Sequence, residues 1–256
     1  MHIDLNCDLG ESFGRYTLGD DSAMLRIVTS ANVACGLHAG DPLVMQATVA
    51  QAAAHSVAIG AHPGYPDRQG FGRRAMHFAP EELSAFILYQ LGALQAFTQT
   101  AGVPLTHVKP HGALYNVAAR DDNTAAAIAL AIAALDPALI VVTQPGSALE
   151  LAARAAGLRV AREGFADRAY QADGSLVPRN APGAVIHDPE KAAARAIRMA
   201  RQGEVETIDG GIIPLRIDTL CVHGDTPGAP AIAAQLRAAL EDAGIVIAPF
   251  TQTLVP

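Results

Sequence analysis

The sequence predicts an α/β fold in which parallel strands close into a barrel. Two observations predict it: short apolar runs alternate with segments of helical spacing, and several of those runs are polar on one face. Alternating strands and helices give parallel strands with crossover helices, either as an open doubly wound sheet or as a closed barrel, and about seven strands fit both. Strands of an open sheet covered on both faces read as nearly continuously apolar, so the polar faces favour the barrel.

The strands are predicted from these short apolar runs. In the first, a period of two places Asp4, Asn6 and Asp8 on one face and apolar residues on the other. The same spacing groups His107 with Lys109 in the fourth. Such side chains need an interior that tolerates polar groups, which the middle of a barrel open at one end provides. The predicted strands are His2 to Cys7, Ser30 to Ala34, Val57 to Ala61, Leu105 to Lys109, Leu139 to Thr143, Arg159 to Glu163 and Ile217 to Val222.

Helical spacing is clearest from Pro80 to Ala101. Pro80 suits the first turn of a helix, where a missing N–H costs nothing, and Gly102 ends the segment. Two more helices are predicted, one beginning at Asp188 and closed by Gly203, the other running from the Thr226-Pro227 region to Gly244.

Composition limits the class of protein. The 256 residues, half of them hydrophobic, suit a single barrel domain over residues 1–256. The net charge of -7 is scattered, and no basic stripe with aromatics is present, so nucleic acid is not expected as a partner. Three widely spaced cysteines suit a reducing cytoplasm. The acidic N-terminal stretch and the short apolar runs predict neither export nor a membrane span.

Chemically capable side chains follow nearly every predicted strand. In a parallel α/β barrel the active site lies at the carboxyl ends of the strands, so these groups are expected to meet. Taken singly, a histidine after a strand more often has a structural role, as a helix cap or a partner of a carbonyl group, than a catalytic one. Asp41 is likewise predicted to be a helix N-cap. Charged groups gathered at one mouth must be paired, metal-bound or reactive. The candidates are Asn6, Asp8, His38, His62, Lys109, His111, Glu163, Arg168 and His223.

Lys109 is one of only two lysines, with Lys191. In the barrel interior, desolvation lowers the pKa of a lysine and nearby carboxylates raise it, and the balance decides between a proton donor and a fixed cation. Two interpretations remain open. Lys109 either forms an internal salt bridge with Asp4, Asp8 or Glu163, or holds an anionic substrate or intermediate.

Six sequence blocks lie at or near the ends of predicted strands: NCDLGE at 6–11, ANVACGLHAGD at 31–41, GAHPGYPD at 60–67, KPHGALYN at 109–116, EGFADRAY at 163–170 and VHGD at 222–225. Together they resemble the LamB/YcsF family. The resemblance covers nearly the whole chain and implies a seven-stranded (β/α) TIM-like barrel similar to the glycoside hydrolase and deacetylase superfamily. It also implies ATP-dependent opening of 5-oxo-L-proline to L-glutamate, carried out with 5-oxoprolinase subunits B and C.

Lactam opening of this kind needs a base for water, donors for developing negative charge and a cation for the carboxylate or phosphoryl group. Asp8 or Glu163 is hypothesised as the base, and His62 and His111 as proton shuttles or oxyanion donors. Lys109 joins Arg168 in binding anionic groups. Asn6, His38 and His223 complete the predicted substrate-binding set.

ATP is the expected co-substrate, yet the chain has no G-x-x-x-x-G-K-[ST] phosphate loop. ATP is therefore expected to bind atypically or mainly on a partner subunit. The two long connections, 63–79 and 164–187, are predicted to be lids.

Two alternatives stay open. The first is a metal-dependent deacetylase or amidohydrolase in which Asp8, His38, His62 or His223 hold Zn²⁺, whereas the leading interpretation assigns no metal ligand. The second is a non-catalytic sensor or carbohydrate-binding module.

Overall fold

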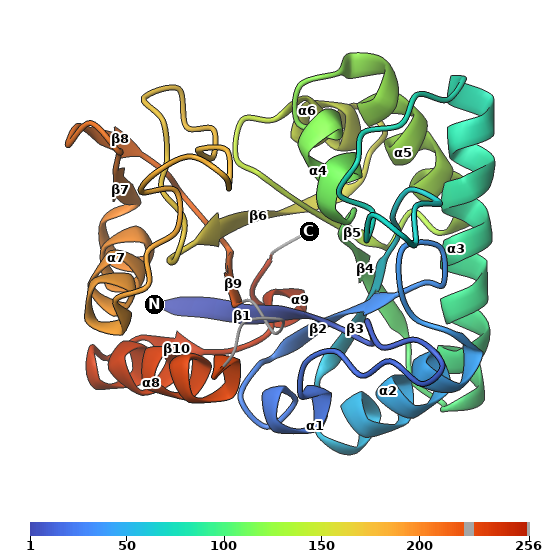
Figure 1. The fold of residues 1–256 in the computed structure, drawn as a ribbon, viewed down its shortest axis with the longest axis horizontal. Helices are drawn as coiled ribbons and strands as arrows, with labels where there is room; N and C mark the ends of the chain where they lie inside the picture. The colour runs from blue at the N-terminus through green and yellow to red at the C-terminus, as the bar shows by residue number, and fades with distance from the viewer. Residues whose placement is uncertain (223–227, 255–256) are drawn as a thin grey trace.

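Seven parallel strands close into a barrel in the computed structural model, which describes residues 1–222 and 228–254 (Figure 1). Each strand pairs in parallel with the next, and β9 pairs with both β6 and β1, which closes the ring. The barrel prediction is therefore confirmed, and the open sheet is excluded. The strands are β1 (His2–Leu9), β2 (Ser30–Ala34), β3 (Ala58–His62), β4 (Leu105–Val108), β5 (Ile140–Thr143), β6 (Arg159–Phe165) and β9 (Thr219–Val222).

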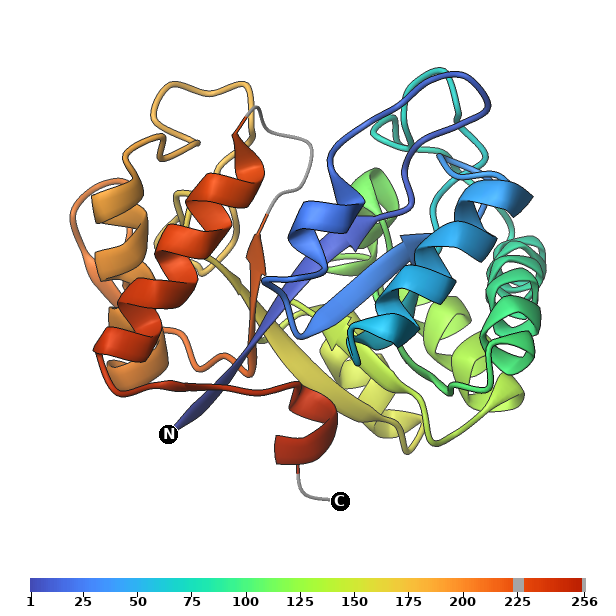
Figure 2. The same cartoon turned by 90° about the horizontal axis from the view of Figure 1, so that it is seen from below.

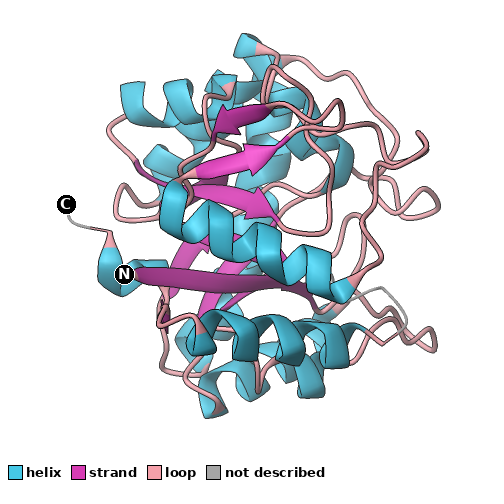
Figure 3. Cartoon of the chain, turned by 90° about the vertical axis from the view of Figure 1, so that its left-hand side faces the viewer, coloured by secondary structure: helices cyan, strands magenta, loops and turns pink. Residues whose placement is uncertain are grey.

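Helices cover the outside of the strands (Figure 3). The predicted helix bounds are confirmed for α3 (Pro80–Thr100) and α7 (Pro189–Gln202), the latter capped by Asp188 and ended by Gly203 at φ 65°. The predicted start of the last helix, near Thr226, lies outside the described residues. The other helices are α1 (Asp21–Met24), α2 (Pro42–Ala54), α4 (Gly112–Ala118), α5 (Asp122–Leu135), α6 (Ala148–Ala155), α8 (Ala229–Asp242) and α9 (Phe250–Thr253).

The two faces of β1 meet different surroundings, as its alternating sequence predicts. Ile3 and Leu5 point outward into the main hydrophobic core beneath the helices. Asp4 points inward and is fully buried, and its Oδ1 accepts hydrogen bonds from Ser30 at 2.6 Å and Thr29 at 2.7 Å. These hydroxyl donors satisfy the carboxylate, so the barrel interior holds charged groups without leaving them bare.

The amino-terminal end of the barrel is closed by α9 (Figure 2). Phe250, fully buried, enters an apolar layer with Ile140, Val142 and Ala161, and its ring lies 5.0 Å from that of His107. The polar layers above this plug are therefore approached from the carboxyl ends of the strands.

Three short strands lie outside the barrel and were not predicted. The strand β10 (Val246–Ile247) pairs with the start of β1, and β7 (Glu204–Glu206) pairs with β8 (Ile212–Pro214) as an antiparallel hairpin. Among the described residues, no helix combines the length and apolar character needed to cross a membrane.

Candidate active site

A cavity of about 420 Å³ opens at the carboxyl ends of the barrel strands. Five of the candidate residues line it: Asp8, His62, Lys109, His111 and Arg168. They come from β1, from β3 and from the segments that follow β4 and β6. The structure thus brings distant parts of the chain together at one rim, while the roles of these residues in a reaction stay predictions.

Lys109 lies at the centre of a buried ionic network. Its Nζ is 2.7 Å from Glu163 Oε1, 3.0 Å from Asp8 Oδ1 and 3.3 Å from Asn6 Oδ1. Burial alone would lower the pKa of Lys109, but its anionic neighbours, Asp8 foremost, raise it well above the usual value. Lys109 is therefore a fixed cation rather than a proton donor. The salt bridge forms with Asp8 and Glu163, not with Asp4.

The two candidate bases occupy different positions. Glu163 is fully buried, accepts a hydrogen bond from Tyr115 Oη at 2.6 Å, and is not part of the cavity wall. The side chain of Asp8 is 22% exposed, and its Oδ2 lies 3.3 Å from His62 Nε2. Burial would raise the pKa of Asp8, but His62 and Lys109 together hold it well below its usual range. Asp8 is thus the ionised carboxylate that faces the cavity.

Asn6, predicted to bind substrate, lies in a layer below the cavity wall. Its Nδ2 donates to Thr219 Oγ1 at 2.7 Å, and its Oδ1 accepts from Asn32 Nδ2 at 2.8 Å. Asn6 is fully buried and does not line the cavity, so its position does not support the predicted contact with substrate. Asn6 instead supports Lys109 from below. His107 is equally deep, bonded to Asn32 at 3.0 Å, and does not join the other histidines.

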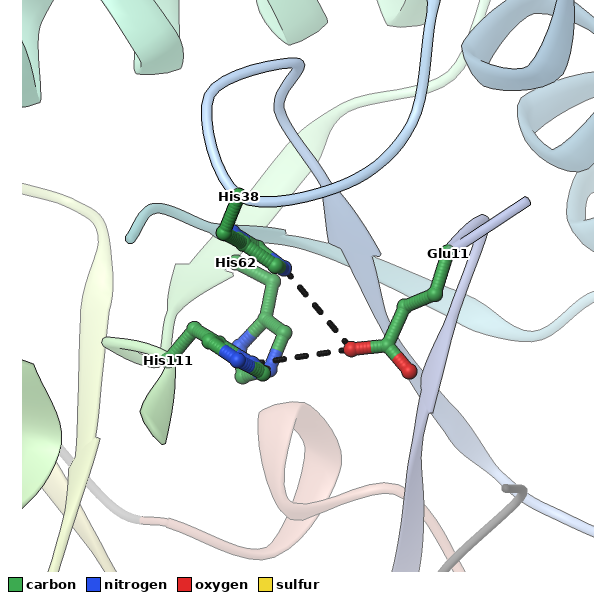
Figure 4. A group of neighbouring side chains, drawn as sticks. All are labelled: Glu11, His38, His62 and His111. Atoms are coloured by element: carbon green, nitrogen blue, oxygen red, sulfur yellow. Dashed lines mark hydrogen bonds and ion pairs between the residues drawn. The ribbon is translucent and has the colours of Figure 1, made fainter. Parts of the chain in front are cut away.

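Three predicted histidines gather beside the cavity with Glu11, which was not among the residues predicted from the sequence (Figure 4). His38 and His111 stack with ring centroids 3.8 Å apart, and His62 meets both edge-on. Glu11 Oε1 is 3.7 Å from His38 Nε2 and 3.5 Å from His111 Nδ1. Burial lowers the pKa of His38 well below its usual value and lowers that of His111 to about 3.

The only signal for Glu11 in the sequence was its place directly after the first strand, in the NCDLGE block. His223, predicted to bind substrate, lies outside the described residues.

Arginines that were not predicted from the sequence also line the cavity. Arg73 and Arg179 come from the two long connections that were predicted to be lids, and Arg120 follows α4. With the predicted Arg168, whose guanidinium donates to Val177 O at 2.7 Å, they give this wall a strong positive character. Such a wall favours an anionic ligand, because guanidinium groups bind carboxylates and phosphates in paired hydrogen bonds.

Comparison with known proteins places these features in a family. The model of the LamB/YcsF family matches residues 3–255, so the chain belongs to that family. A protein of Heliobacterium modesticaldum, named as the A subunit of 5-oxoprolinase, is 57% identical over 96% of this chain and 97% of that protein. A protein of the same name from Pyrococcus furiosus is 55% identical, over 98% of each chain.

Solved structures agree with the barrel. A lactam utilization protein from Thermus thermophilus is 53% identical and superposes with a TM-score of 0.93, covering 97% of this chain and 99% of that chain. A putative cellobiose-phosphate cleavage protein from Enterococcus faecalis V583 reaches a TM-score of 0.56 at 13% identity, with 99% of each chain covered, and shares the fold alone.

Proposed function

Because this chain belongs to the LamB/YcsF family, we propose that it is the A subunit of a 5-oxoprolinase. In this function it opens 5-oxo-L-proline to L-glutamate with hydrolysis of ATP, together with subunits B and C. The observation that carries the proposal is the similarity to proteins of that name over nearly their whole length, at more than half identity. The three buried free thiols support our placing the chain in the cytoplasm.

The cavity suits such a substrate. Its volume of about 420 Å³ falls in the range of small-molecule sites, roughly 300–1,000 Å³. The substrate carries a carboxylate, and phosphorylation of its amide oxygen would add more negative charge. The four arginines of the cavity wall, Arg73, Arg120, Arg168 and Arg179, supply the cations that these groups need.

We assign the role of base to Asp8. Its Oδ1 is held by Lys109 at 3.0 Å and by Asn32 Nδ2 at 2.9 Å, which leaves Oδ2 toward His62 and the cavity. Glu163 is disfavoured because Lys109 and Tyr115 occupy its oxygens below the wall. Lys109 positions both carboxylates, so it acts on the substrate mainly through Asp8.

His62 and His111 form a path for protons away from Asp8. Asp8 Oδ2 and His62 Nε2 are 3.3 Å apart, and His62 Nε2 and His111 Nδ1 are 3.0 Å apart. A proton taken from water by Asp8 can reach the leaving nitrogen of the opened ring through these imidazoles. General acid–base groups placed in this way contribute about 10²–10⁴-fold to a rate.

Reconstitution tests the proposal. The chain is mixed with purified B and C subunits, and glutamate is measured with 5-oxo-L-proline and ATP present or omitted. We expect turnover only with all three chains and both substrates, since no phosphate loop for ATP stands in this sequence. Robust activity of the isolated chain, or none in the complete mixture, would contradict the assignment.

A variant pair then tests the base. Asp8→Asn keeps the shape of the side chain and should lower kcat at least about 100-fold, while Asp122→Asn, at an exposed position in α5, should leave it unchanged. Equal activity of the two variants would remove Asp8 from the mechanism.

A second candidate, metal-dependent hydrolysis of a cyclic or acetylated amide, is favoured by one observation, the histidine and carboxylate group beside the cavity. It predicts turnover that does not require ATP, so the same mixtures separate the two functions.

A further inference from the structure

Four side chains from four consecutive strand ends point at one spot beside the cavity (Figure 4). Glu11 follows β1, His38 follows β2, His62 ends β3 and His111 follows β4. One ligand atom from each lies within 4.8 Å of the other three. We call these four residues the imidazole–carboxylate cluster.

The backbone fixes which ring nitrogens face the centre of the cluster. His62 Nδ1 is 2.7 Å from Lys109 O, and His111 Nε2 is 2.7 Å from Phe71 O. A carbonyl oxygen only accepts hydrogen bonds, so each of these two nitrogens carries the hydrogen. In the neutral rings, His62 Nε2 and His111 Nδ1 therefore both hold lone pairs, and they face each other at 3.0 Å.

The loop that orients His111 is held in an uncommon backbone conformation. Phe71, which supplies the carbonyl oxygen, has φ 54°, a value that residues other than glycine rarely adopt. The next residue, Gly72, has φ 62°, and a Cβ there would lie 2.8 Å from the His111 ring. Strained backbone of this kind persists where the surrounding structure fixes it, often at a functional site.

His38 completes the cluster without a hydrogen bond of its own. It is 1% exposed, and within the described part of the chain neither of its ring nitrogens has a hydrogen-bond partner. Its Nε2 lies 3.7 Å from Glu11 Oε1. A buried imidazole without a hydrogen bond is costly, unless a bound ligand uses its lone pair.

We propose that Glu11, His38, His62 and His111 bind one divalent transition-metal ion, with Zn²⁺ as the best match. Three imidazole nitrogens and one carboxylate oxygen suit Zn²⁺, whereas Mg²⁺ and Ca²⁺ prefer oxygen ligands alone. Ligand atoms about 2.0–2.1 Å from a tetrahedral ion lie about 3.3 Å from one another. Three of the separations in the cluster, 3.0, 3.5 and 3.7 Å, lie near that value, and all lie within 4.8 Å. The His38 and His111 rings are stacked, so metal binding requires one of them to tilt until both lone pairs face the ion.

The outer contacts agree with this site. Histidine ligands usually donate their second N–H to a carbonyl or carboxylate oxygen, as His62 and His111 do here. The set differs from the one expected for zinc from the sequence, because it includes Glu11 and His111 and does not include Asp8, while His223 lies outside the described residues. Asp8 is held by Lys109 through one oxygen, although its other oxygen stays 3.3 Å from His62 Nε2.

The site borders the cavity, since His62 and His111 line its wall. If the proposed function holds, a cation bound there would polarise the oxygen of the cyclic amide. It would also occupy His62 Nε2 and His111 Nδ1, so the proton path through these two imidazoles belongs to the metal-free protein. The binding itself rests only on the four side chains and does not depend on that function.

Metal binding is tested on the full chain without a histidine tag. The protein is stripped with a chelator, titrated with ZnCl₂ at neutral pH by calorimetry, and assayed for bound metal after gel filtration. We expect one equivalent per chain, a higher Tm with zinc, and an X-ray absorption spectrum with three nitrogen ligands and one oxygen ligand at about 2.0–2.1 Å. A stripped protein that takes up no zinc and shows no change in Tm would overturn the proposal.

Variants identify the ligands. Glu11→Gln keeps the size of the side chain and His38→Phe keeps the stack on His111, and each should weaken zinc binding by more than the 10–100-fold typical of outer-contact changes. The control His55→Gln changes an exposed histidine and should bind like the parent chain. Unchanged affinity in both cluster variants would also refute the site. None of these readouts requires turnover, so they stand apart from failure of the reconstituted reaction.

Discussion

Replacement of Lys109 by methionine is the sharpest test of the buried ionic network. The ammonium lies between two carboxylates, 2.7 Å from Glu163 Oε1 and 3.0 Å from Asp8 Oδ1, and the residue is 3% exposed. Methionine fills similar volume without charge. The variant therefore leaves two carboxylates close together with no cation between them.

The expected loss is large compared with the total stability of a domain. Removing one partner of a buried ion pair destabilises by about 3–5 kcal/mol, against about 5–15 kcal/mol for a whole domain. The Asp8 side chain is 22% exposed and can keep some water, while that of Glu163 is fully buried. Most of the loss should therefore arise at Glu163, and the double variant Lys109→Met with Glu163→Gln should recover more than half of it.

Urea unfolding of the four proteins of this double-mutant cycle gives the free energies of unfolding and the coupling between the two residues. Lys191→Met is the matched control, because Lys191 is the other lysine and is exposed on α7. The control should differ from the parent by less than about 0.5 kcal/mol. The reasoning from buried charge is wrong if Lys109→Met lowers the free energy of unfolding by less than about 1 kcal/mol. It is also wrong if the double variant Lys109→Met with Glu163→Gln is less stable than Lys109→Met alone.

Two further predictions concern the barrel. A Cβ on Gly60 would lie 2.1 Å from the His107 ring, so Gly60→Ala should destabilise by about 1–3 kcal/mol. Gly92→Ala, in open space on α3, should stabilise by roughly 0.5–1 kcal/mol in the same unfolding assay. Burial lowers the pKa of His107 to about 3, whereas the pKa of this histidine in the unfolded chain is near 6.5. Between pH 6.5 and pH 3 only the unfolded chain takes up the proton, so the free energy of unfolding falls as the pH falls. Between pH 7 and pH 5 this one group should lower the free energy of unfolding by about 2 kcal/mol. In the His107→Gln variant, the free energy of unfolding should therefore fall by about 2 kcal/mol less over the same pH range. If the variant and the parent chain show the same dependence on pH, the account is wrong.

The sequence predicts the barrel well because the period of the side chains is a local property. Asp4 and Ile3 alternate between a polar and an apolar face, and both faces are where the alternation places them. The same logic brings Asp8, His62 and Lys109 to one rim. Strand ends differ by no more than two residues from the predicted ones, because pairing with neighbours decides where a strand stops.

The depth of a side chain within the barrel was harder to predict. Asn6 and Asp8 share a face of β1. Asn6 is buried and bonded to Thr219 and Asn32, whereas Asp8 lines the cavity. That difference depends on the stagger of neighbouring strands, which no local pattern reports. Glu11 and the arginines were missed for a related reason, since their loops gain their positions only from tertiary contacts.

Helix α9 fills the amino-terminal end of the barrel, so the candidate site is reached from the carboxyl ends of the strands. Among the described residues, Phe250 and its apolar neighbours fill the end beneath His107, and the cavity that leads toward the inner polar groups is lined by Asp8 and His62. A partner chain bound over that rim would therefore control the access of solvent, protons and ions to the cavity without any rearrangement of the strands.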